Sequence, residues 1–166
     1  MGHELVSGTV TTEKLRTRQE TVRWRRQFDG SLVFTNGVFD ILHPGHLATL
    51  EAARALGSAL VVALNDDDSV RALGKGPDRP VNDGGARAAA IAGLETVDAV
   101  VFFSEETPVE LIRELRPDVL VKGADYRGHE VPGADFVESI GGRLVLVPLL
   151  PGYSTTNIVE RMREQS

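Results

Sequence analysis

Five apolar runs recur along the chain, and each is separated from the next by a segment with helical spacing of its apolar residues. Within the runs, polar residues do not alternate with apolar ones, which is typical of parallel strands that are buried on both faces of a sheet. The pattern predicts strands at 31–35, 58–64, 98–103, 118–121 and 143–148.

The segments between these strands predict helices. They lie at 67–73, 86–94, 107–115, 133–140 and 155–163, and a further helix starts near Pro44. Thr107 and Glu110 have the spacing of a capping box around Pro108, while Arg116-Pro117 predicts the end of the same helix. Because crossovers between parallel strands are right-handed, we predict an α/β fold in one domain, a Rossmann-like, doubly wound, five-stranded parallel sheet flanked by helices.

The first 30 residues have a different pattern, and we assign 1–30 to an N-terminal arm and helix and 31–166 to the main domain. Residues 1–10 are expected to be disordered, and Thr12 is expected to cap a helix over 12–28. Five arginines beside Trp24 raise the alternative of a nucleic-acid contact, but the favoured interpretation is the solvated face of a helix packed on the domain.

Residues 31–46 carry the first chemical signal. A buried strand is followed by Gly37, which is expected to break it, and then by His43-Pro44-Gly45-His46 at the start of a helix. Proline is well tolerated in the first helical turn, and a helix N-terminus attracts anions through its free N–H groups. Histidines three positions apart share one side of the helix, so both imidazoles can donate to one polyphosphate. Asp40 is expected either to hold the turn or a histidine in place or to cap the helix.

Three further segments are predicted to meet the same edge, because ligands of doubly wound sheets bind beyond the carboxyl ends of the strands. These segments are 65–71, 121–126 and 152–159. Lys122 is one of only three lysines and follows a buried strand directly, which favours a phosphate contact over a solvated side chain. Ser154 is expected to cap the last helix, and the hydroxyls beside it would form a second anion site.

Composition narrows the function classes. The net charge of −6 argues against a broad nucleic-acid surface. The absence of cysteine excludes disulfides, thiol catalysis and cysteine-ligated metals. No apolar run approaches the ~20 residues of a membrane span, and no signal peptide is evident, so we expect a cytoplasmic protein without membrane or nucleic-acid partners.

The strand, the Thr35-Asn36-Gly37-x-Phe39-Asp40 turn and His43-x-Gly45-His46 together resemble the nucleotidyltransferase superfamily, which shares His-x-Gly-His with class I aminoacyl-tRNA synthetases. Later segments resemble, in order, the adenylyltransferases of ADP-heptose synthesis. These segments include 79–82, 117–123, 125–126 and 154–158. The resemblance is to the free-standing form, since no sugar-kinase domain precedes the match.

This resemblance implies transfer of AMP from ATP to D-glycero-D-manno-heptose 1-phosphate, with Mg²⁺ brought by ATP and no metal site on the protein. It implies catalytic roles for His43, His46 and Lys122. The residues implied in ATP binding are Thr35, Asn36, Gly37, Phe39, His43, Gly45, His46, Gly123, Asp125, Ser154, Thr155 and Thr156. Those implied in sugar-phosphate binding are Asp40, Asn65, Asp66, Arg79 and Lys122. A homo-oligomer, a dimer or larger, is also expected.

Two other functions stay open. A cytidylyltransferase for glycerol 3-phosphate shares the His-x-Gly-His and Ser-Thr-Thr segments, but such enzymes carry an arginine shortly before the second segment, and 149–153 contains none. A non-catalytic nucleotide-binding or regulatory module would be expected to lose a motif histidine or the final hydroxyls, and the chain retains both.

Overall fold

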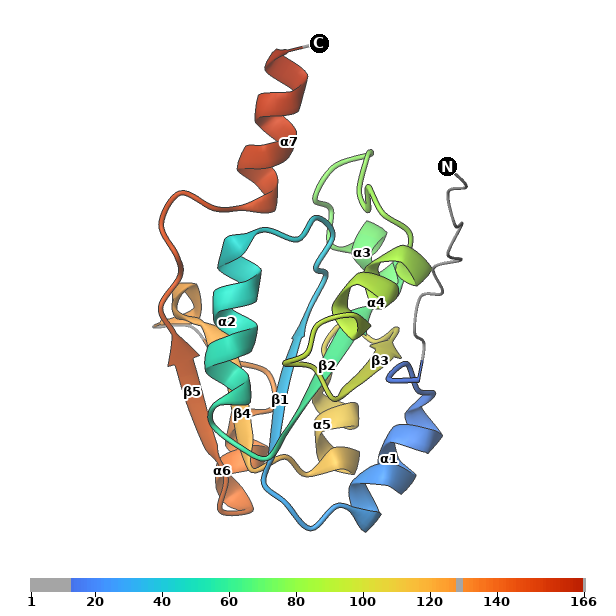
Figure 1. Ribbon diagram of the computed structural model, residues 1–166, viewed down its shortest axis with the longest axis vertical. Coiled ribbons are helices and arrows are strands. Elements are labelled where there is room, and N and C mark those ends of the chain that lie inside the picture. The colour runs from blue at the N-terminus through green and yellow to red at the C-terminus, as the bar shows by residue number, and fades with distance from the viewer. Residues whose placement is uncertain (1–12, 128–129, 166) are drawn as a thin grey trace, which may run out of the picture.

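A computed structural model describes residues 13–127 and 130–165 of the chain (Figure 1). Its centre is one parallel sheet with the strand order β3-β2-β1-β4-β5. The strands are β1 (Leu32–Gly37), β2 (Ala59–Asn65), β3 (Ala99–Phe103), β4 (Val119–Gly123) and β5 (Arg143–Val147). Since β1 has β2 on one side and β4 on the other, the strand order reverses beside β1, where such folds bind ligands.

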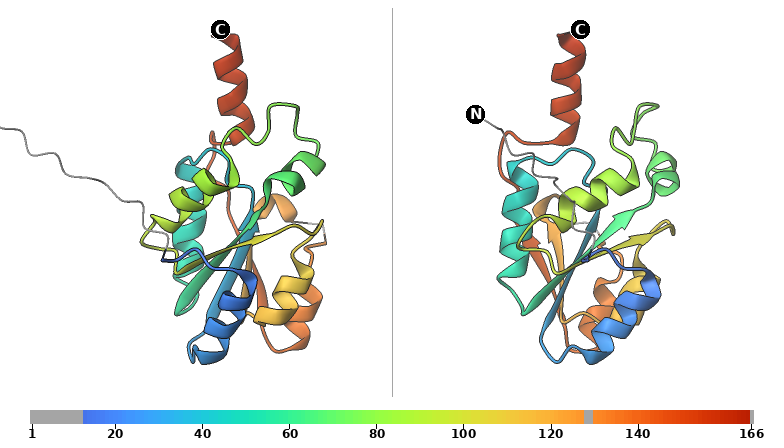
Figure 2. Two further views of the ribbon diagram at one scale, coloured as in Figure 1. Left: turned by 90° about the vertical axis from the view of Figure 1, so that its right-hand side faces the viewer. Right: turned by 45° about the vertical axis from the view of Figure 1, so that its right-hand side comes forward.

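Helices cover both faces of the sheet. They are α1 (Arg18–Gln27), α2 (Pro44–Arg54), α3 (Asp67–Ala72), α4 (Gly84–Ala92), α5 (Val109–Leu115), the 3₁₀ turn η1 (Ala124–Tyr126), α6 (Ala134–Ser139) and α7 (Thr155–Glu164). Helices α2 and α4 pack on one face, and α1, α5 and α6 pack on the other (Figures 1 and 2). Each face has its own apolar core, with Leu50 and Ile91 in one and Leu111 and Leu115 in the other.

This architecture confirms the predicted fold class, and the observed strands lie within two residues of the predicted ones. Gly37 does not break β1, as the sequence had suggested, because it pairs in register with Leu64 of β2 and so belongs to the strand. None of the helices in the described residues is long and apolar enough to cross a membrane.

The N-terminal helix begins later than predicted. Residues 14–16 run beside the edge strand β3, where the Val100 N–H donates to the Lys14 carbonyl at 2.8 Å and the Arg16 N–H donates to the Val100 carbonyl at 2.9 Å. The helix starts only afterwards, with Thr17 as its N-cap in a capping box with Glu20. A start at residue 12 is therefore wrong. Thr12 itself and residues 1–10 lie outside the described residues.

Two arginines of α1, Arg18 and Arg25, attach the helix to the domain. Arg18 pairs with Glu105 and Glu114, and Arg25 donates to the carbonyls of Leu115 and Arg116. These contacts support a helix packed on the domain. The separation of residues 1–30 from the rest as a distinct unit stays a prediction.

The predicted capping box at α5 does not form. The helix begins at Val109 with Pro108 as its N-cap, and no side chain caps it. Glu110 pairs instead with Arg113, one turn along the helix, at 2.7 Å. The predicted end of the helix is confirmed, because Arg116 adopts the left-handed conformation (φ 47°) as C-cap just before Pro117.

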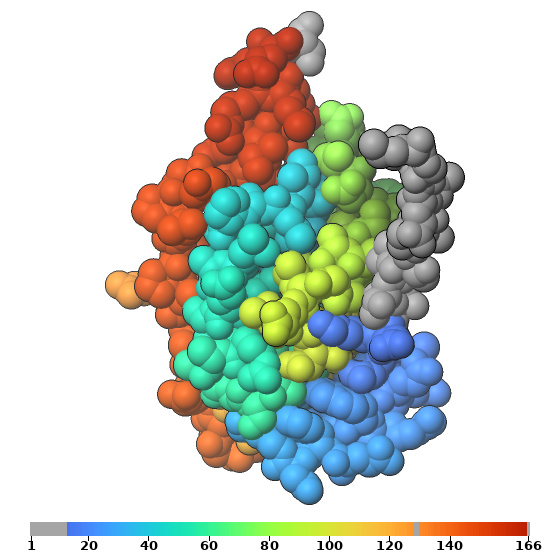
Figure 3. Space-filling model, viewed as in Figure 1, coloured from blue at the N-terminus to red at the C-terminus, as the bar shows by residue number. Residues whose placement is uncertain are grey.

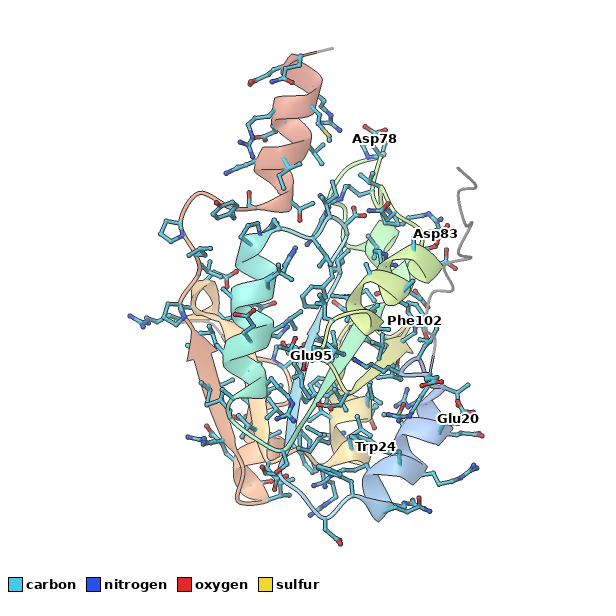
Figure 4. The ribbon with its side chains drawn as sticks, viewed as in Figure 1. Glu20, Trp24, Asp78, Asp83, Glu95 and Phe102 are labelled. Atoms are coloured by element: carbon cyan, nitrogen blue, oxygen red, sulfur yellow. The ribbon has the colours of Figure 1, made fainter. Side chains whose placement is uncertain are left out.

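Helix α7 has a different environment from the other helices. No residue of it is buried, and it rises beyond the end of the domain in every view (Figures 1, 2 and 3). Near its C-terminal end, Arg163 pairs at 2.8 Å with Asp78, which lies in the loop between α3 and α4 (Figure 4). The side-chain contacts described for α7 therefore include one to a loop at the carboxyl edge of the sheet.

Candidate active site

The two motif histidines form a stacked pair at the start of α2. His43 is the N-cap residue, Pro44 is the first helical residue, and the His46 N–H donates to the His43 carbonyl at 2.9 Å. The imidazole centroids lie 3.8 Å apart with 21° between the ring planes. In the described part of the chain, the Nδ1 atoms of both rings are buried without a hydrogen-bond partner. The first helical turn thus presents two imidazoles side by side, as predicted from their spacing.

Two neighbours fix this pair. The Phe39 ring, on a backbone with a φ of 50°, lies 5.1 Å from the His46 ring. A Cβ atom on Gly45 would lie 2.9 Å from two atoms of the His43 ring, so only glycine fits there without displacing the ring. The resemblance implies Gly45 in ATP binding, and the structure adds that this glycine accommodates the His43 ring.

Both imidazoles are uncharged at neutral pH in the free protein. The pKa of His46 is lowered to about 4, mainly by burial, with smaller electrostatic contributions from His43 and Lys75. Burial also lowers the pKa of His43. A neutral imidazole still has one N–H to donate, so the pair offers hydrogen bonds without a permanent positive charge.

Lys122 lies near the carboxyl end of β4 and lines cavities at the same edge of the sheet as the histidines. Its Nζ donates to the Asn36 carbonyl at 3.0 Å and lies 5.2 Å from the centre of the Tyr126 ring. Burial is the largest cause that lowers the pKa of Lys122, to about 8. No carboxylate within salt-bridge distance pairs with this ammonium in the described residues.

Lys75 is a site residue that sequence reasoning missed. It lies in the loop between α3 and α4 and lines three neighbouring cavities around the carboxyl edge of the sheet. Partial desolvation of its ammonium group and the charge of Arg79 lower its pKa, although the residue as a whole is exposed. The glycines on either side, Gly74 (φ 65°) and Gly76 (φ 120°), adopt conformations that favour glycine. A lysine between two glycines, in a chain with only three lysines, was the signal that could have revealed it.

Asp40 and Arg79 form a buried ion pair beside the histidines, with the Arg79 Nε donating to the Asp40 Oδ2 at 2.6 Å. The backbone N–H groups of Val81 and Asn82 also donate to this carboxylate. Burial alone would raise the pKa of Asp40, but these three hydrogen bonds outweigh it, so the pKa lies below its usual value. Asp40 therefore holds the turn in place, as one alternative proposed. The other alternative, a helix N-cap, is wrong, since His43 occupies that position.

The end of β2 contributes two residues from the predicted sugar-phosphate set. The Asn65 Nδ2 donates to the Ser69 Oγ at 2.9 Å, and Asn65 lines a cavity. Asp66 is the N-cap of α3, where its carboxylate accepts from the Ser69 N–H at 2.8 Å. Both side chains thus have internal partners, and their contact with a sugar phosphate stays a prediction.

The first turn of α7 meets the histidines from the other side. Ser154 caps the helix by accepting from the Asn157 N–H at 3.0 Å, which confirms its predicted capping role. The Thr155 hydroxyl donates to the Ile41 carbonyl at 3.4 Å and so ties this turn to the turn before α2. The free N–H groups of two helix starts therefore face one space.

The remaining predicted residues line the wall between β1 and β4. The Thr35 hydroxyl donates to the Val121 carbonyl at 3.0 Å, and the Asn36 Oδ1 is buried without a partner among the described residues. A Cβ atom on Gly123 would lie 2.6 Å from the Asp125 Oδ1, so a larger residue there would displace that carboxylate.

Two cavities divide the site. The histidine cavity, of about 530 Å³, is lined by His43, Gly45, His46, Asp40, Arg79, Asp125, Ser154, Thr155 and Thr156, among others. The lysine cavity, of about 270 Å³, is lined by Asn36, Asn65, Lys75, Glu106, Thr107, Lys122 and Tyr126, among others. Lys75 lines both, and a third cavity that includes His46, Lys75 and Lys122 lies between them. The arrangement suits two anionic substrates whose phosphates meet near these cations.

The described residues contain no group of three histidine or acidic side chains placed to hold a metal ion. Mg²⁺ commonly binds through one or two carboxylates and substrate phosphates, and Asp125 is a carboxylate on the wall of the histidine cavity. The site therefore fits an ion that arrives as MgATP, and this expectation stays a prediction.

Comparison with known proteins assigns the chain to a family. Residues 34–161 match the family model described as cytidylyltransferase-like. The chain belongs to this family of nucleotidyltransferases. The matched segment begins within β1 and ends within α7, so it includes both helix starts of the histidine cavity.

Curated relatives in the family include the bifunctional protein HldE of Gluconacetobacter diazotrophicus, which is 57% identical over 146 residues. The match covers 87% of this chain and 30% of the relative. The bifunctional protein HldE of Azorhizobium caulinodans is 58% identical over 132 residues, covering 80% of this chain and 27% of the relative. The chain thus spans about 30% of the length of these relatives.

Solved structures in the same comparison agree with the fold. The lipopolysaccharide core biosynthesis protein from Thermoplasma volcanium superposes with a TM-score of 0.61 at 30% identity, covering 73% of this chain and 97% of that one. The pantoate-beta-alanine ligase from Francisella tularensis, complexed with beta-gamma ATP and beta-alanine, superposes with a TM-score of 0.56 at 12% identity. This second likeness supports the fold alone.

Proposed function

We propose that this chain is an adenylyltransferase that transfers AMP from ATP to D-glycero-D-manno-heptose 1-phosphate and releases pyrophosphate. The observation that carries the proposal is the stacked His43–His46 pair, which faces the start of α7 across the histidine cavity. The lysine cavity adjoins it and gives a second phosphate a place to bind. The resemblance to the adenylyltransferases of ADP-heptose synthesis and the HldE relatives support the choice of substrates.

The reaction forms one phosphorus–oxygen bond and breaks another. An oxygen of the sugar phosphate attacks the α-phosphorus of ATP, and the bond from this phosphorus to the bridging oxygen of pyrophosphate breaks. A phosphate monoester is already an anion at neutral pH, so the chemistry needs no protein nucleophile. The protein has to align the two substrates and to stabilise the charge that grows on the transferred group and the leaving oxygen.

The proposed roles follow from placement. His43, His46 and the N–H groups at the starts of α2 and α7 donate to the triphosphate in the histidine cavity. Lys122 and Lys75 hold the attacking phosphate where the two cavities meet, which reduces its repulsion from ATP. Mg²⁺ supplied with ATP would neutralise charge on the triphosphate.

Pyrophosphate release tests the proposal. The protein is incubated with ATP or CTP and with a panel of acceptors that includes heptose 1-phosphate, hexose 1-phosphates and glycerol 3-phosphate. We expect ATP with heptose 1-phosphate to react fastest. A clear preference for CTP with glycerol 3-phosphate would favour the cytidylyltransferase alternative, and nucleotide binding without turnover on any acceptor would favour a non-catalytic module.

A further inference from the structure

The lysine cavity has charges of opposite sign on its walls. Lys75 and Lys122 supply two ammonium groups, and they are close enough for Lys75 to lower the pKa of Lys122. Glu106 and Thr107, from the connection between β3 and α5, line the same cavity and add a carboxylate and a hydroxyl. A molecule that fills this cavity therefore meets cations at one place and a carboxylate at another.

The fold itself does not use these two polar side chains. The adjacent Glu105 is paired with Arg18 on α1, whereas Glu106 is exposed and makes no side-chain hydrogen bond or ion pair to the described residues. Thr107 is equally unengaged, because the capping box expected from the sequence does not form. In the folded protein, the Glu106 carboxylate and the Thr107 hydroxyl at this cavity are therefore available to hydrogen-bond a ligand.

Charge decides what each part of the cavity accepts. A phosphate is attracted to the two lysines, and an anionic group beside Glu106 would be repelled. Hydroxyl groups are suited to the carboxylate, since each can donate a charge-assisted hydrogen bond to it. An acceptor with a phosphate at one end and an uncharged, polyhydroxylated tail matches this distribution, and one with a second phosphate at the far end does not.

We propose that Glu106, together with Thr107, is a specificity-determining residue that binds the hydroxyl groups of the acceptor tail and rejects acceptors with a second anionic group there. This inference rests on the proposed function, because it concerns the acceptor of the same reaction. It adds a selection for an uncharged tail that none of the residues assigned above provides.

The test compares two acceptors in the full chain with ATP: an aldose 1-phosphate that the wild type uses, and the same sugar with a second phosphate at its far carbon. The variants are Glu106→Gln and Thr107→Val. The matched control is Glu105→Gln, which removes the same charge one residue away. KM and kcat are measured for each acceptor, KM is measured for ATP, and thermal midpoints establish that the variants are folded.

For Glu106→Gln we expect kcat/KM for the monophosphate to fall about 10- to 100-fold, mainly through KM, which is the scale of one charged hydrogen bond. Use of the bisphosphate relative to the monophosphate should rise at least ~10-fold, since the repelling charge is gone. Thr107→Val should weaken binding of the monophosphate by a smaller factor, and Glu105→Gln should leave the ratio unchanged. KM for ATP should stay the same in all three variants.

A folded Glu106→Gln variant with the wild-type ratio between the two acceptors would overturn the inference while the proposed function stands. An equal change of the ratio in Glu105→Gln would also overturn it, because the effect would then be one of general charge. Wild-type protein that releases no pyrophosphate with any sugar phosphate would refute the proposed function and the inference with it, and this outcome is recognised before any variant is made.

Discussion

His43 and His46 illustrate how a neutral group can serve an anionic reaction. With the pKa of His46 at about 4, the ring is uncharged in the free protein, so ATP gains hydrogen bonds but no full ion pair from it. Such donors contribute most where negative charge increases, at the transferred phosphoryl group and the leaving oxygen. Their effect should therefore be larger in the transition state than in the bound ground state.

This reasoning leads to a prediction for the alanine variants. His43→Ala and His46→Ala should each lower the single-turnover rate by roughly 10²- to 10³-fold, while ATP affinity changes much less. The asparagine variants should retain part of the rate, because an amide can still donate. Single-turnover kinetics, ATP titration and thermal midpoints are measured together. Folded alanine variants with near-normal rates would remove both imidazoles from the chemistry.

Lys122 gives a prediction for the dependence of activity on pH. With its pKa at about 8, Lys122 loses its proton above that pH in the free protein, while the acceptor phosphate stays a dianion. We expect kcat/KM for the acceptor to fall above about pH 8, and Lys122→Arg, if active, to show no such fall, because arginine remains charged.

Lys122→Ala measures how much the lysine contributes to kcat/KM for the acceptor. Loss of a charge-assisted contact to a phosphate should cost about 2 kcal/mol in kcat/KM for the acceptor. If Lys122→Arg declines at the same pH as the wild type, another group is responsible for the titration. If Lys122→Ala keeps both substrate constants, the lysine does not contact phosphate.

At the scale of single residues, the sequence predicted those site residues whose role shows in the neighbouring sequence. It missed those whose role depends on distant parts of the chain. The stacked histidines and the Ser154 cap followed from spacing within one helical turn. Lys75 reaches the site through a long loop, so its position depends on tertiary structure. The partner of Asp40 was unforeseen for the same reason, since Arg79 is 39 positions away in the chain.

At the scale of secondary-structure elements, Arg87 of α4 joins several segments that carry the site. Its side chain is fully buried and donates to the carbonyls of Val38, Asn65 and Asn82, and it pairs with Asp67 on α3 at 2.7 Å. These bonds connect the turn after β1, the end of β2 and the start of α4. Arg87 is therefore placed to fix the relative positions of the segments that line the two cavities.

We expect Arg87→Met to lower the free energy of unfolding by about 3–5 kcal/mol, because it leaves several buried acceptors without a donor. Activity should fall more than the fraction of folded protein does, since the loops of the site lose their common partner. The control is Arg71→Met, whose partner Asp68 is exposed, and it should change stability by less than ~0.5 kcal/mol. Urea denaturation and turnover are measured on both variants. Equal losses of stability and activity in Arg87→Met and Arg71→Met would contradict the proposed role of Arg87.

The elements themselves were largely predictable, and the errors have physical causes. Strands with continuous apolar runs were found because burial on both faces leaves a clear pattern. The start of α1 was missed because residues 14–16 pair with β3, and pairing with a distant strand leaves no local mark. At α5, proline took the N-cap position, so Thr107 could not form the expected box.

At the scale of the whole molecule, the two edges of the sheet differ in what they carry: hydrogen-bonded carboxylates at the amino ends of the strands, and cavities at the carboxyl ends. At the amino ends of the strands, the carboxylates of Asp118 and Asp98 accept from the N–H groups of Leu32 and Leu60 at 2.7 Å. These aspartates also pair with Arg25 and Arg54. The carboxyl ends carry the cavities, with buried polar atoms that lack partners within the described chain. The amino ends of β1 and β2 are thus held by carboxylate hydrogen bonds, whereas the carboxyl ends carry the proposed chemistry.

The half-buried His46 should make the free energy of unfolding depend on pH. In the unfolded chain His46 titrates near 6.5, whereas in the folded protein its pKa is about 4. Between these values the unfolded chain binds a proton that the native one does not, so the free energy of unfolding falls as the pH falls. The carboxylate of Asp40 acts at lower pH, because its lowered pKa gives stability that is lost only below its usual value of 3.8.

We expect the wild type to lose about 1 kcal/mol from this source between pH 7 and pH 5, after allowance for partial exposure of the ring. That corresponds to ~2–4 °C in the thermal midpoint. His46→Asn should show a smaller drop over the same interval, as measured by calorimetry. An identical pH dependence in the two proteins would show that His46 does not titrate as described.

The predicted homo-oligomer is a property of the whole molecule that stays a prediction. Several large apolar side chains are exposed near the start of α7, namely Leu149, Leu150 and Tyr153. Light scattering over a range of protein concentrations would measure the oligomeric state directly.

Helix α7 has one more consequence, and it concerns the exchange of backbone hydrogens with solvent. A ten-residue helix without buried side chains has little more protection than a free peptide of that length, where helices are marginal. Its amides should therefore take up deuterium quickly in the free protein. If its first turn binds a nucleotide, uptake should slow when ATP is added and stay fast with a sugar phosphate alone. The mass of the C-terminal peptide would then report occupancy of the histidine cavity without any turnover.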